Sequence, residues 1–578
     1  MTLDTVALEI MWNRLLSVAN EQQVTLMRTA FSTVVRETQD LACGVFDTRG
    51  SMIAQSMTGT PGHINAMATG VRHFLNAFPP ATLVPGDVLI TNDPWLTAGQ
   101  INDMTVLSPV FRGRTVVAYF ASTCHAPDIG GRLLSAEAHE VYEEGLRIPM
   151  TRLFAAGEPN EELLRILRAN VRTPEETVGD LYAQAAANAV GGRGLLAFMD
   201  EFGLETIDPL ADEIIGRSER ALRDAIRKIP NGRYENEVWS DGFEEPIRIK
   251  VAVTIGDEDI LIDFAGSSPQ SRRGINVVLN YTHAYASFAI KAAVSPEVPH
   301  NEGAFRPVRV VAPEGSVLNC REPAAVASRH IIGHFLPGAI FGALAPAMPG
   351  RLMAGGAEPV WISMWRGQWP ESRSPFTFTL FQCGGAGARA TLDGLSATGF
   401  PSGVAGVPAE VVESLTPLVQ HRRELKTDSG GPGRWRGGLG QRTQMGLRTD
   451  RGPAAEWSVS AMIDRIDHPG AGLEGGAPGG PGGFGLADGS PARAKALVVL
   501  RPDARVELDP PGGGGYGPAF EREPARVLHD VVEGYVSLEA AARDYGVVIE
   551  YLGRPDQLVR LPEDYRIDQA ATAARRRP

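Results

Sequence analysis

Acidic and histidine side chains that could bind a metal gather between residues 92 and 131. Asp103 stands just before one strand-like segment, TVLSPVF, and His125 stands just after a second, VVAYFAS. A carboxylate and an imidazole that converge can bind a divalent metal or carry out acid–base catalysis. Asp40 precedes another strand-like segment, LACGVF, in the same manner. Asp40, Asp103 and His125 are therefore the predicted catalytic residues and metal ligands.

Two β-hairpins must position these side chains. Arg112-Gly113-Arg114 separates the segments that carry Asp103 and His125, and a short connection with glycine is typical of a hairpin. The outer ends of an antiparallel pair lie side by side, so we expect both side chains in one site. Asp40 occupies the open end of the second hairpin, whose turn is Asp47-Thr48-Arg49-Gly50.

Further reactive groups lie in the adjoining segments. His63 falls in TGTPGHINAM, where glycine and proline predict a loop. Asp93 follows the strand-like segment DVLIT, and Asp128 follows His125 by three residues. Each of these two acids is predicted either to bind the metal or to orient His125 through a hydrogen bond. Cys124 lies beside His125 and could be a nucleophile, but chain neighbours at a strand end point apart, which favours an ordinary buried cysteine.

Composition limits the class of protein. A length of 578 residues predicts two or three domains or one large interlocked body. The composition, 43% hydrophobic and 21% charged, is that of an ordinary soluble protein. The net charge of −13 argues against nucleic acid as a partner. The four cysteines form no CxxC pair, which suits a reducing compartment. No signal peptide and no apolar run of ~20 residues is found, so we expect a cytoplasmic protein without a membrane partner.

Hydrophobic periodicity predicts an α+β fold with β-hairpins, mixed but mainly antiparallel sheets, and helices packed around them. Glycine-rich runs in the final third alternate with strand-like pieces, which favours tight turns in a β-rich body. Amphipathic helices are expected from Asp4, as a cap, toward Phe31, and over residues 66–78, 209–229 and 335–344. The predicted regions are 1–205 around the metal site, 206–520 with the glycine-rich part, and 521–578 as a small helical module and tail.

Nucleotide-binding motifs are absent from the sequence. No GxxxxGK[ST] stretch occurs, so the chain has no P-loop of its own. The residues 385–390 fit a GxGxxA pattern after a strand, but the following TLDGLSATGFPSG cannot form the helix that a dinucleotide requires.

Eight ordered motifs resemble those of the hydantoinase B/oxoprolinase family, the B-type subunits of N-methylhydantoinases, caprolactamases and related acetone-type carboxylases. The resemblance covers roughly residues 4–549. The motifs are RETQDLACGVFD, NDPWLTAGQINDMTV, CHAPDIGG, EGLRIP, NVRTP with GDL, IDFAGSSPQSRRGIN, DSGGPGRWRGGLG and PPGGGGYG.

The resemblance implies a hetero-oligomer in which an A-type subunit binds ATP and phosphorylates the amide or enolate oxygen of the substrate. The B-type subunit then holds a divalent metal (zinc, manganese or magnesium) and completes the reaction by hydrolysis. The expected activity is ATP-dependent opening of a hydantoin, lactam or 5-oxoproline-like ring. A subunit of an acetone-type carboxylase, whose chains are generally longer, and a non-catalytic scaffolding subunit are the alternatives.

Carried over by position, the metal site of the family falls on Asp40, Gln100, Asp103 and His125. The family usually has histidine where Gln100 stands in GQIND, and a neutral amide oxygen suits magnesium or manganese better than zinc. The residues expected to surround the metal or contact the substrate are His63, Asp93, Asp128 and Glu144.

Overall fold

A seven-stranded sheet unites the two predicted hairpins, and its strand pairs are antiparallel. The computed structural model describes residues 5–448, 450, 452, 456–554 and 556–577. In sheet order the strands are β2 (Met52–Gln55), β1 (Leu41–Phe46), β5 (Thr115–His125), β4 (Asp103–Arg112), β3 (Val88–Thr91), β6 (Thr151–Ala155) and β7 (Glu158–Pro159).

The register of this sheet brings the predicted site residues together. Asp103 begins β4 and is paired with His125, which ends β5. On the other side of β5, β1 places Leu41 opposite Cys124, and the His125 backbone N–H donates to the Asp40 carbonyl at 3.2 Å. The predicted hairpins are confirmed, and the ends of three strands meet at one edge of the sheet.

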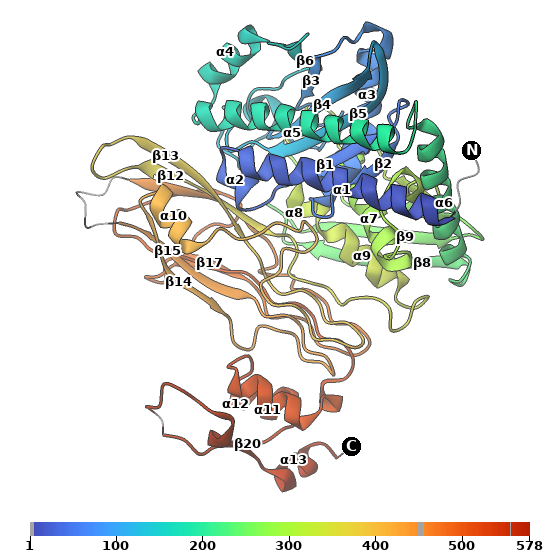
Figure 1. The fold of residues 1–578 in the computed structure, drawn as a ribbon. Helices are drawn as coiled ribbons and strands as arrows, with labels where there is room; N and C mark the ends of the chain where they lie inside the picture. The colour runs from blue at the N-terminus through green and yellow to red at the C-terminus, as the bar shows by residue number, and fades with distance from the viewer. Residues whose placement is uncertain (1–4, 449, 451, 453–455, 555, 578) are drawn as a thin grey trace.

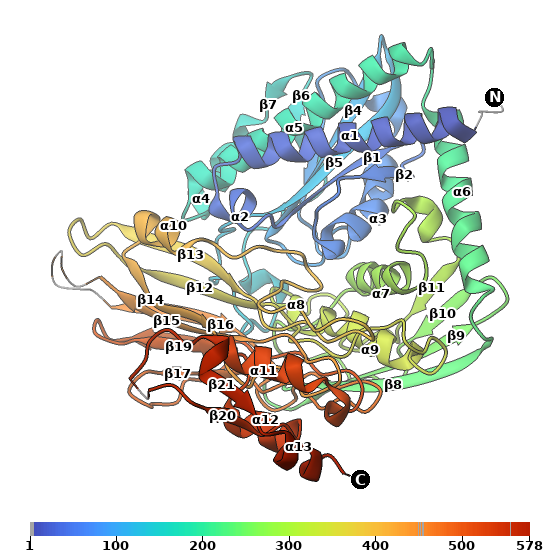
Figure 2. The same ribbon diagram turned by 60° about the horizontal axis from the view of Figure 1, so that its bottom comes forward.

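Helices cover both faces of the sheet. The helices α1 (Thr5–Thr29) and α5 (Pro174–Glu201) lie side by side over one face (Figures 1 and 2), and α3 (Pro61–Ala77) packs on the other. Asp4, the predicted cap of α1, lies outside the described residues. The loop predicted for His63 is wrong: this residue lies in the first turn of α3, because Pro61 has a fixed φ that starts the helix early.

A second layer contains helices and a four-stranded mixed sheet (Figure 2). The predicted helix over residues 335–344 is confirmed as α9, and the preceding short helix α8 ends two residues before it. The helices of this layer are α7 (Leu279–Val294), α8 (His330–Gly333) and α9 (Phe335–Leu344). The strands, in sheet order, are β11 (Val308–Val311), β10 (Ile260–Asp263), β9 (Ile247–Ile255) and β8 (Gly232–Ser240).

Two more four-stranded sheets enclose a core that contains Trp361, Trp365 and Trp457. In sheet order, one contains β13 (Pro375–Gln382), β12 (Trp361–Gln368), β16 (Trp457–Met462) and β18 (Leu497–Leu500). The other contains β14 (Leu418–Leu425), β15 (Gln441–Leu447), β19 (Val506–Asp509) and β17 (Gly483–Leu486). Further helices are α2 (Thr33–Arg36), α4 (Glu161–Asn170), α6 (Asp208–Ile226) and α10 (Ala409–Leu415).

Glycine-rich segments beside these sheets pack backbone against backbone. The Gly513 N–H donates to the Gly438 carbonyl, and the Gly438 N–H donates to the Ala386 carbonyl, both at 2.9 Å. A Cβ on Gly513 would lie 2.1 Å from the Ala386 oxygen, so only glycine permits this approach. The predicted tight turns are therefore wrong for these runs. The glycines whose added Cβ would lie 1.7–2.2 Å from a neighbouring backbone atom include Gly385, Gly387, Gly394, Gly437, Gly438, Gly440, Gly512, Gly514 and Gly515.

The C-terminal segment forms a small module with its own core, as expected (Figure 1). Arg522 joins it to the glycine-rich part, because its guanidinium contacts Asp393 at 2.6 Å and Asp530 at 2.8 Å. The elements are α11 (Pro524–Val532), α12 (Leu538–Asp544), β20 (Ile549–Tyr551), β21 (Tyr565–Ile567) and α13 (Gln569–Arg575). Among the described residues, no helix combines the length and apolarity needed to cross a membrane.

The substitution Gly513→Ala tests the close packing of the glycine-rich segments. We expect it to lower the free energy of unfolding by about 3 kcal/mol, because the new methyl group overlaps a neighbouring carbonyl. Gly485→Ala is the matched control, since its Cβ would lie at an ordinary 3.5 Å from the Ser490 oxygen, and we expect a change within about 1 kcal/mol. Urea denaturation of both variants measures the difference. Equal effects would contradict the packing argument.

Candidate active site

Asp103 lies at the centre of a buried polar cluster at the end of β4. Its Oδ1 atom is 2.7 Å from Gln100 Nε2 and 3.0 Å from His125 Nδ1. Its Oδ2 atom is 2.9 Å from His63 Nε2 and accepts a hydrogen bond from Arg329 Nη2. All five residues are buried, and the Asp103 carboxylate is 0% exposed.

Asp40 completes the cluster from the end of the neighbouring hairpin. Its carboxylate oxygens lie 3.6 Å from His63 Nδ1 and 3.9 Å from His125 Nδ1. The Thr60 hydroxyl donates to Asp40 Oδ1 at 3.0 Å. The structure thus brings the three predicted catalytic residues, and also His63 and Gln100, into one site.

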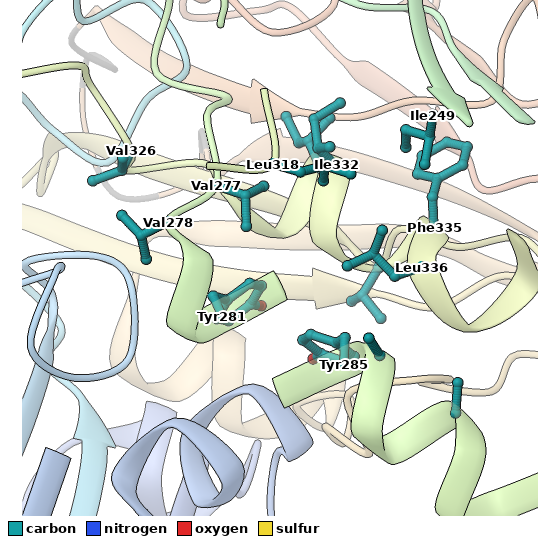
Figure 3. Close-up of a cluster of buried hydrophobic side chains, with 14 of the residues drawn as sticks. Ile249, Val277, Val278, Tyr281, Tyr285, Leu318, Val326, Ile332, Phe335 and Leu336 are labelled. Atoms are coloured by element: carbon teal, nitrogen blue, oxygen red, sulfur yellow. The ribbon is translucent and has the colours of Figure 1, made fainter. Parts of the chain in front are cut away.

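Arg329 is a member of the cluster that the sequence analysis missed. Its Nε atom donates to the Ala98 carbonyl at 2.6 Å, and its guanidinium lies 4.1 Å from the centre of the Tyr281 ring. Figure 3 shows Tyr281 and Tyr285 along α7, with Tyr285 close to Leu336 of α9. The one available signal was a single arginine within the apolar stretch AAVASRHIIGHF, because a charge there must find a buried partner.

The charges in the cluster stabilise one another. Burial raises the pKa of Asp103, but the Arg329 guanidinium and His63 outweigh burial and hold that pKa well below its usual range. Burial lowers the pKa of His63, but the carboxylates of Asp103 and Asp40 outweigh it, so the pKa of His63 is raised. The cluster therefore contains an ionised carboxylate between a guanidinium and an imidazole that favours its cationic form.

Two of the predicted surrounding residues are paired elsewhere. Asp93 accepts from Arg147 Nε at 2.8 Å. Asp128 contacts Arg172 Nη1 at 2.6 Å. The hydrogen bonds and ion pairs of His125 within the described chain go to other groups, so neither acid orients His125.

Glu144 supports the cluster from outside. Its Oε1 atom accepts from the backbone N–H groups of Val326 at 2.6 Å and Ala327 at 2.7 Å, in the segment that leads to Arg329. Burial raises the pKa of Glu144 to about 8, although these two hydrogen bonds act to lower it.

Cys124 has the properties of an ordinary buried cysteine. Burial, followed by the charge of Asp180, raises the pKa of its thiol well above the usual value. The thiolate, which is the nucleophilic form, is therefore disfavoured at neutral pH.

Three side chains of the cluster are of types that bind divalent cations. Gln100 Nε2, Asp103 Oδ1 and His125 Nδ1 are separated by 2.7, 2.8 and 3.0 Å. Adjacent ligands of a six-coordinate ion with bonds of about 2.1 Å lie about 3 Å apart. A rotation of the Gln100 amide group by 180° exchanges its nitrogen and oxygen, so that the oxygen faces Asp103 Oδ1 and His125 Nδ1. No group of three or more His, Cys, Asp or Glu side chains in the described residues could hold a metal ion, so any metal set at this site would have to include the Gln100 amide oxygen.

Glu144→Gln tests the support of the Arg329 segment, because the amide oxygen can still accept both hydrogen bonds but does not titrate. The folded-state pKa of about 8 exceeds the unfolded value of about 4. Stability from the neutral carboxyl is therefore complete at low pH and is lost as the pH rises toward 8. We expect the wild-type free energy of unfolding, relative to the variant, to fall by about 1 kcal/mol per pH unit between about pH 5 and 8. Parallel urea-denaturation profiles over this range would contradict the assignment.

Known proteins share this architecture over the full chain. The B-type subunit of a putative D-/L-hydantoinase from Pseudomonas sp. (strain NS671) is 30% identical over 575 residues, which cover 95% of each chain. The crystal structure of ATP-dependent caprolactamase from Pseudomonas jessenii is 29% identical, covers 100% of both chains and gives a TM-score of 0.89.

A nucleotide-free acetone carboxylase structure has the same fold. It is 20% identical with a TM-score of 0.86 and covers 98% of this chain and 82% of that one. Residues 4–519 match the family described as Hydantoinase B/oxoprolinase. This chain therefore belongs to the hydantoinase B/oxoprolinase family.

Proposed function

We propose that this chain is the B-type subunit of an ATP-dependent cyclic-amide hydrolase. It opens a hydantoin, lactam or 5-oxoproline-like ring after an A-type partner subunit has phosphorylated the amide oxygen. The observation that carries the proposal is the buried cluster of Asp40, Gln100, Asp103 and His125. Relatives named as a hydantoinase subunit and an ATP-dependent caprolactamase support the substrate class and the need for a partner.

Activation by the partner accounts for the chemistry required of this chain. A ring amide resists attack because its nitrogen donates electrons to the carbonyl. Phosphorylation of the oxygen makes the carbonyl carbon more electrophilic, so that a nucleophile can attack it. Water can then add to the carbon, the carbon–nitrogen bond breaks as the nitrogen takes up a proton, and hydrolysis of the resulting acyl phosphate releases the carboxylate and inorganic phosphate. The cluster is buried, which keeps bulk water away from the activated substrate.

The protein ligands proposed for the metal are Gln100, Asp103 and His125, with Asp40 beside them. A divalent ion held there would lower the pKa of a bound water, to about 7 in the case of zinc, and so would supply hydroxide near neutral pH. His63 and Arg329 contact Oδ2 of Asp103, so Oδ1 of the same carboxylate faces Gln100 and His125. The contacts of His63 and Arg329 with Oδ2 fix the orientation of the Asp103 carboxylate.

A panel of ring substrates tests the proposed activity. The purified chain is mixed with an A-type partner, ATP and a hydantoin, caprolactam or 5-oxoproline, and the ring-opened acid and ADP are measured. We expect both products with at least one ring, and only when both subunits are present. Bicarbonate-dependent carboxylation of a ketone, with no ring opening, would instead support the acetone-carboxylase alternative. No activity with any substrate would support a scaffolding role.

Metal affinity tests the proposed ligands independently of turnover. Gln100→His restores the imidazole found in most of the family, and we expect it to raise zinc affinity at least about tenfold, because imidazole is the better zinc ligand. Asp103→Asn should lower the affinity for manganese by a similar factor. Competition with a chromophoric chelator measures both. Unchanged affinities in both variants would rule out this ligand set.

A further inference from the structure

His330 is a buried histidine with no partner for its ring. It is the first residue of α8, is 3% exposed, and neither ring nitrogen has a hydrogen bond within the described part of the chain. His334 lies one turn later, with 5.7 Å between the ring centres. Its nitrogens are both satisfied, by the Tyr285 hydroxyl at 3.0 Å and by the Val360 N–H at 3.4 Å. The two histidines therefore differ in what they contact, although they are equally buried.

The unpartnered ring lines a small cavity next to the metal-ligand cluster. The cavity measures about 30 Å³, and Asp40, His63, Gln100 and His125 also line it. His63 Nδ1 and His125 Nε2 are two more buried ring nitrogens without a hydrogen bond. A space of this size holds one water molecule, which needs two to four polar partners. The lining histidines supply that number.

His330 keeps a neutral ring at physiological pH. Burial, and then the neighbouring His334 and Arg329, hold the pKa of His330 well below the usual value. A neutral imidazole offers one N–H donor and one nitrogen acceptor. Burying both unpaired is costly for the protein alone, so a bound polar molecule is needed to satisfy them.

We propose that His330 is a further catalytic residue, whose ring binds and orients the water molecule that attacks the activated substrate. This inference rests on the proposed hydrolase function. The water lies in the cavity between His330 and the cluster. It donates a hydrogen bond to the imidazole nitrogen that acts as an acceptor. His334 has a different role: it is structural and joins α8 to α7 and to the segment before β12.

The matched variants His330→Phe and His334→Phe test this assignment in the complex with the A-type partner. The His330 ring has no hydrogen bond to lose, so we expect His330→Phe to keep or raise the thermal midpoint. We also expect its kcat to fall at least 100-fold with little change in KM. His330→Asn, which keeps a donor and an acceptor, should recover part of kcat. His334→Phe should lower the thermal midpoint by several degrees, because Tyr285 and Val360 lose their partner.

Three results would overturn the inference. The first is wild-type kcat in His330→Phe, while the wild-type complex is active. The second is a loss of thermal stability equal to that of His334→Phe, which would make His330 structural. The third is a loss of bound manganese in His330→Phe, which would make His330 a metal ligand. An inactive wild-type complex would count against the proposed function instead, and the stability comparison would still test the unpartnered ring.

Discussion

The site depends on the compensation of one buried charge, the carboxylate of Asp103. Burial removes the hydration of an ionised carboxylate, and the folded chain must replace it with charges and hydrogen bonds. Gln100, His125, His63 and Arg329 do so at the two carboxylate oxygens. These side chains come from both layers of the molecule, so this ion-pair network also ties the seven-stranded sheet to the helical layer that contains α8.

The local part of the site could be predicted from the sequence. Asp103 and His125 are 22 residues apart, and the pairing of two adjacent strands fixes their distance. Arg329 is 226 residues from Asp103, and no periodic pattern specifies a contact over such a separation. His330 was missed for the same reason. The role proposed for it depends on the partners of each ring nitrogen, which only the folded chain shows.

The glycine-rich third shows a different limit of sequence analysis. Glycine permits both tight turns and close approach of two backbones, and composition alone does not separate them. The strands between the glycine runs could be predicted, because β15, β16 and β18 coincide with strand-like segments of the sequence. The packing of Gly513 on Gly438 could not, since it joins segments that are distant in the chain. Ile362 of β12 and Phe381 of β13 line the cavity beside the site, so the sheet next to these glycine runs also shapes the site.

The fate of the activated substrate in a complex that carries Asp103→Asn shows whether water attacks the substrate at this cluster. A single turnover is run in ¹⁸O-labelled water with the A-type partner and ATP, and ADP and the ring-opened acid are quantified together. We expect the wild-type complex to give acid labelled in its carboxylate, whereas the variant should still form ADP but no labelled acid. Ring opening by the variant at the wild-type rate would show that Asp103 and its cluster are not the site of water attack.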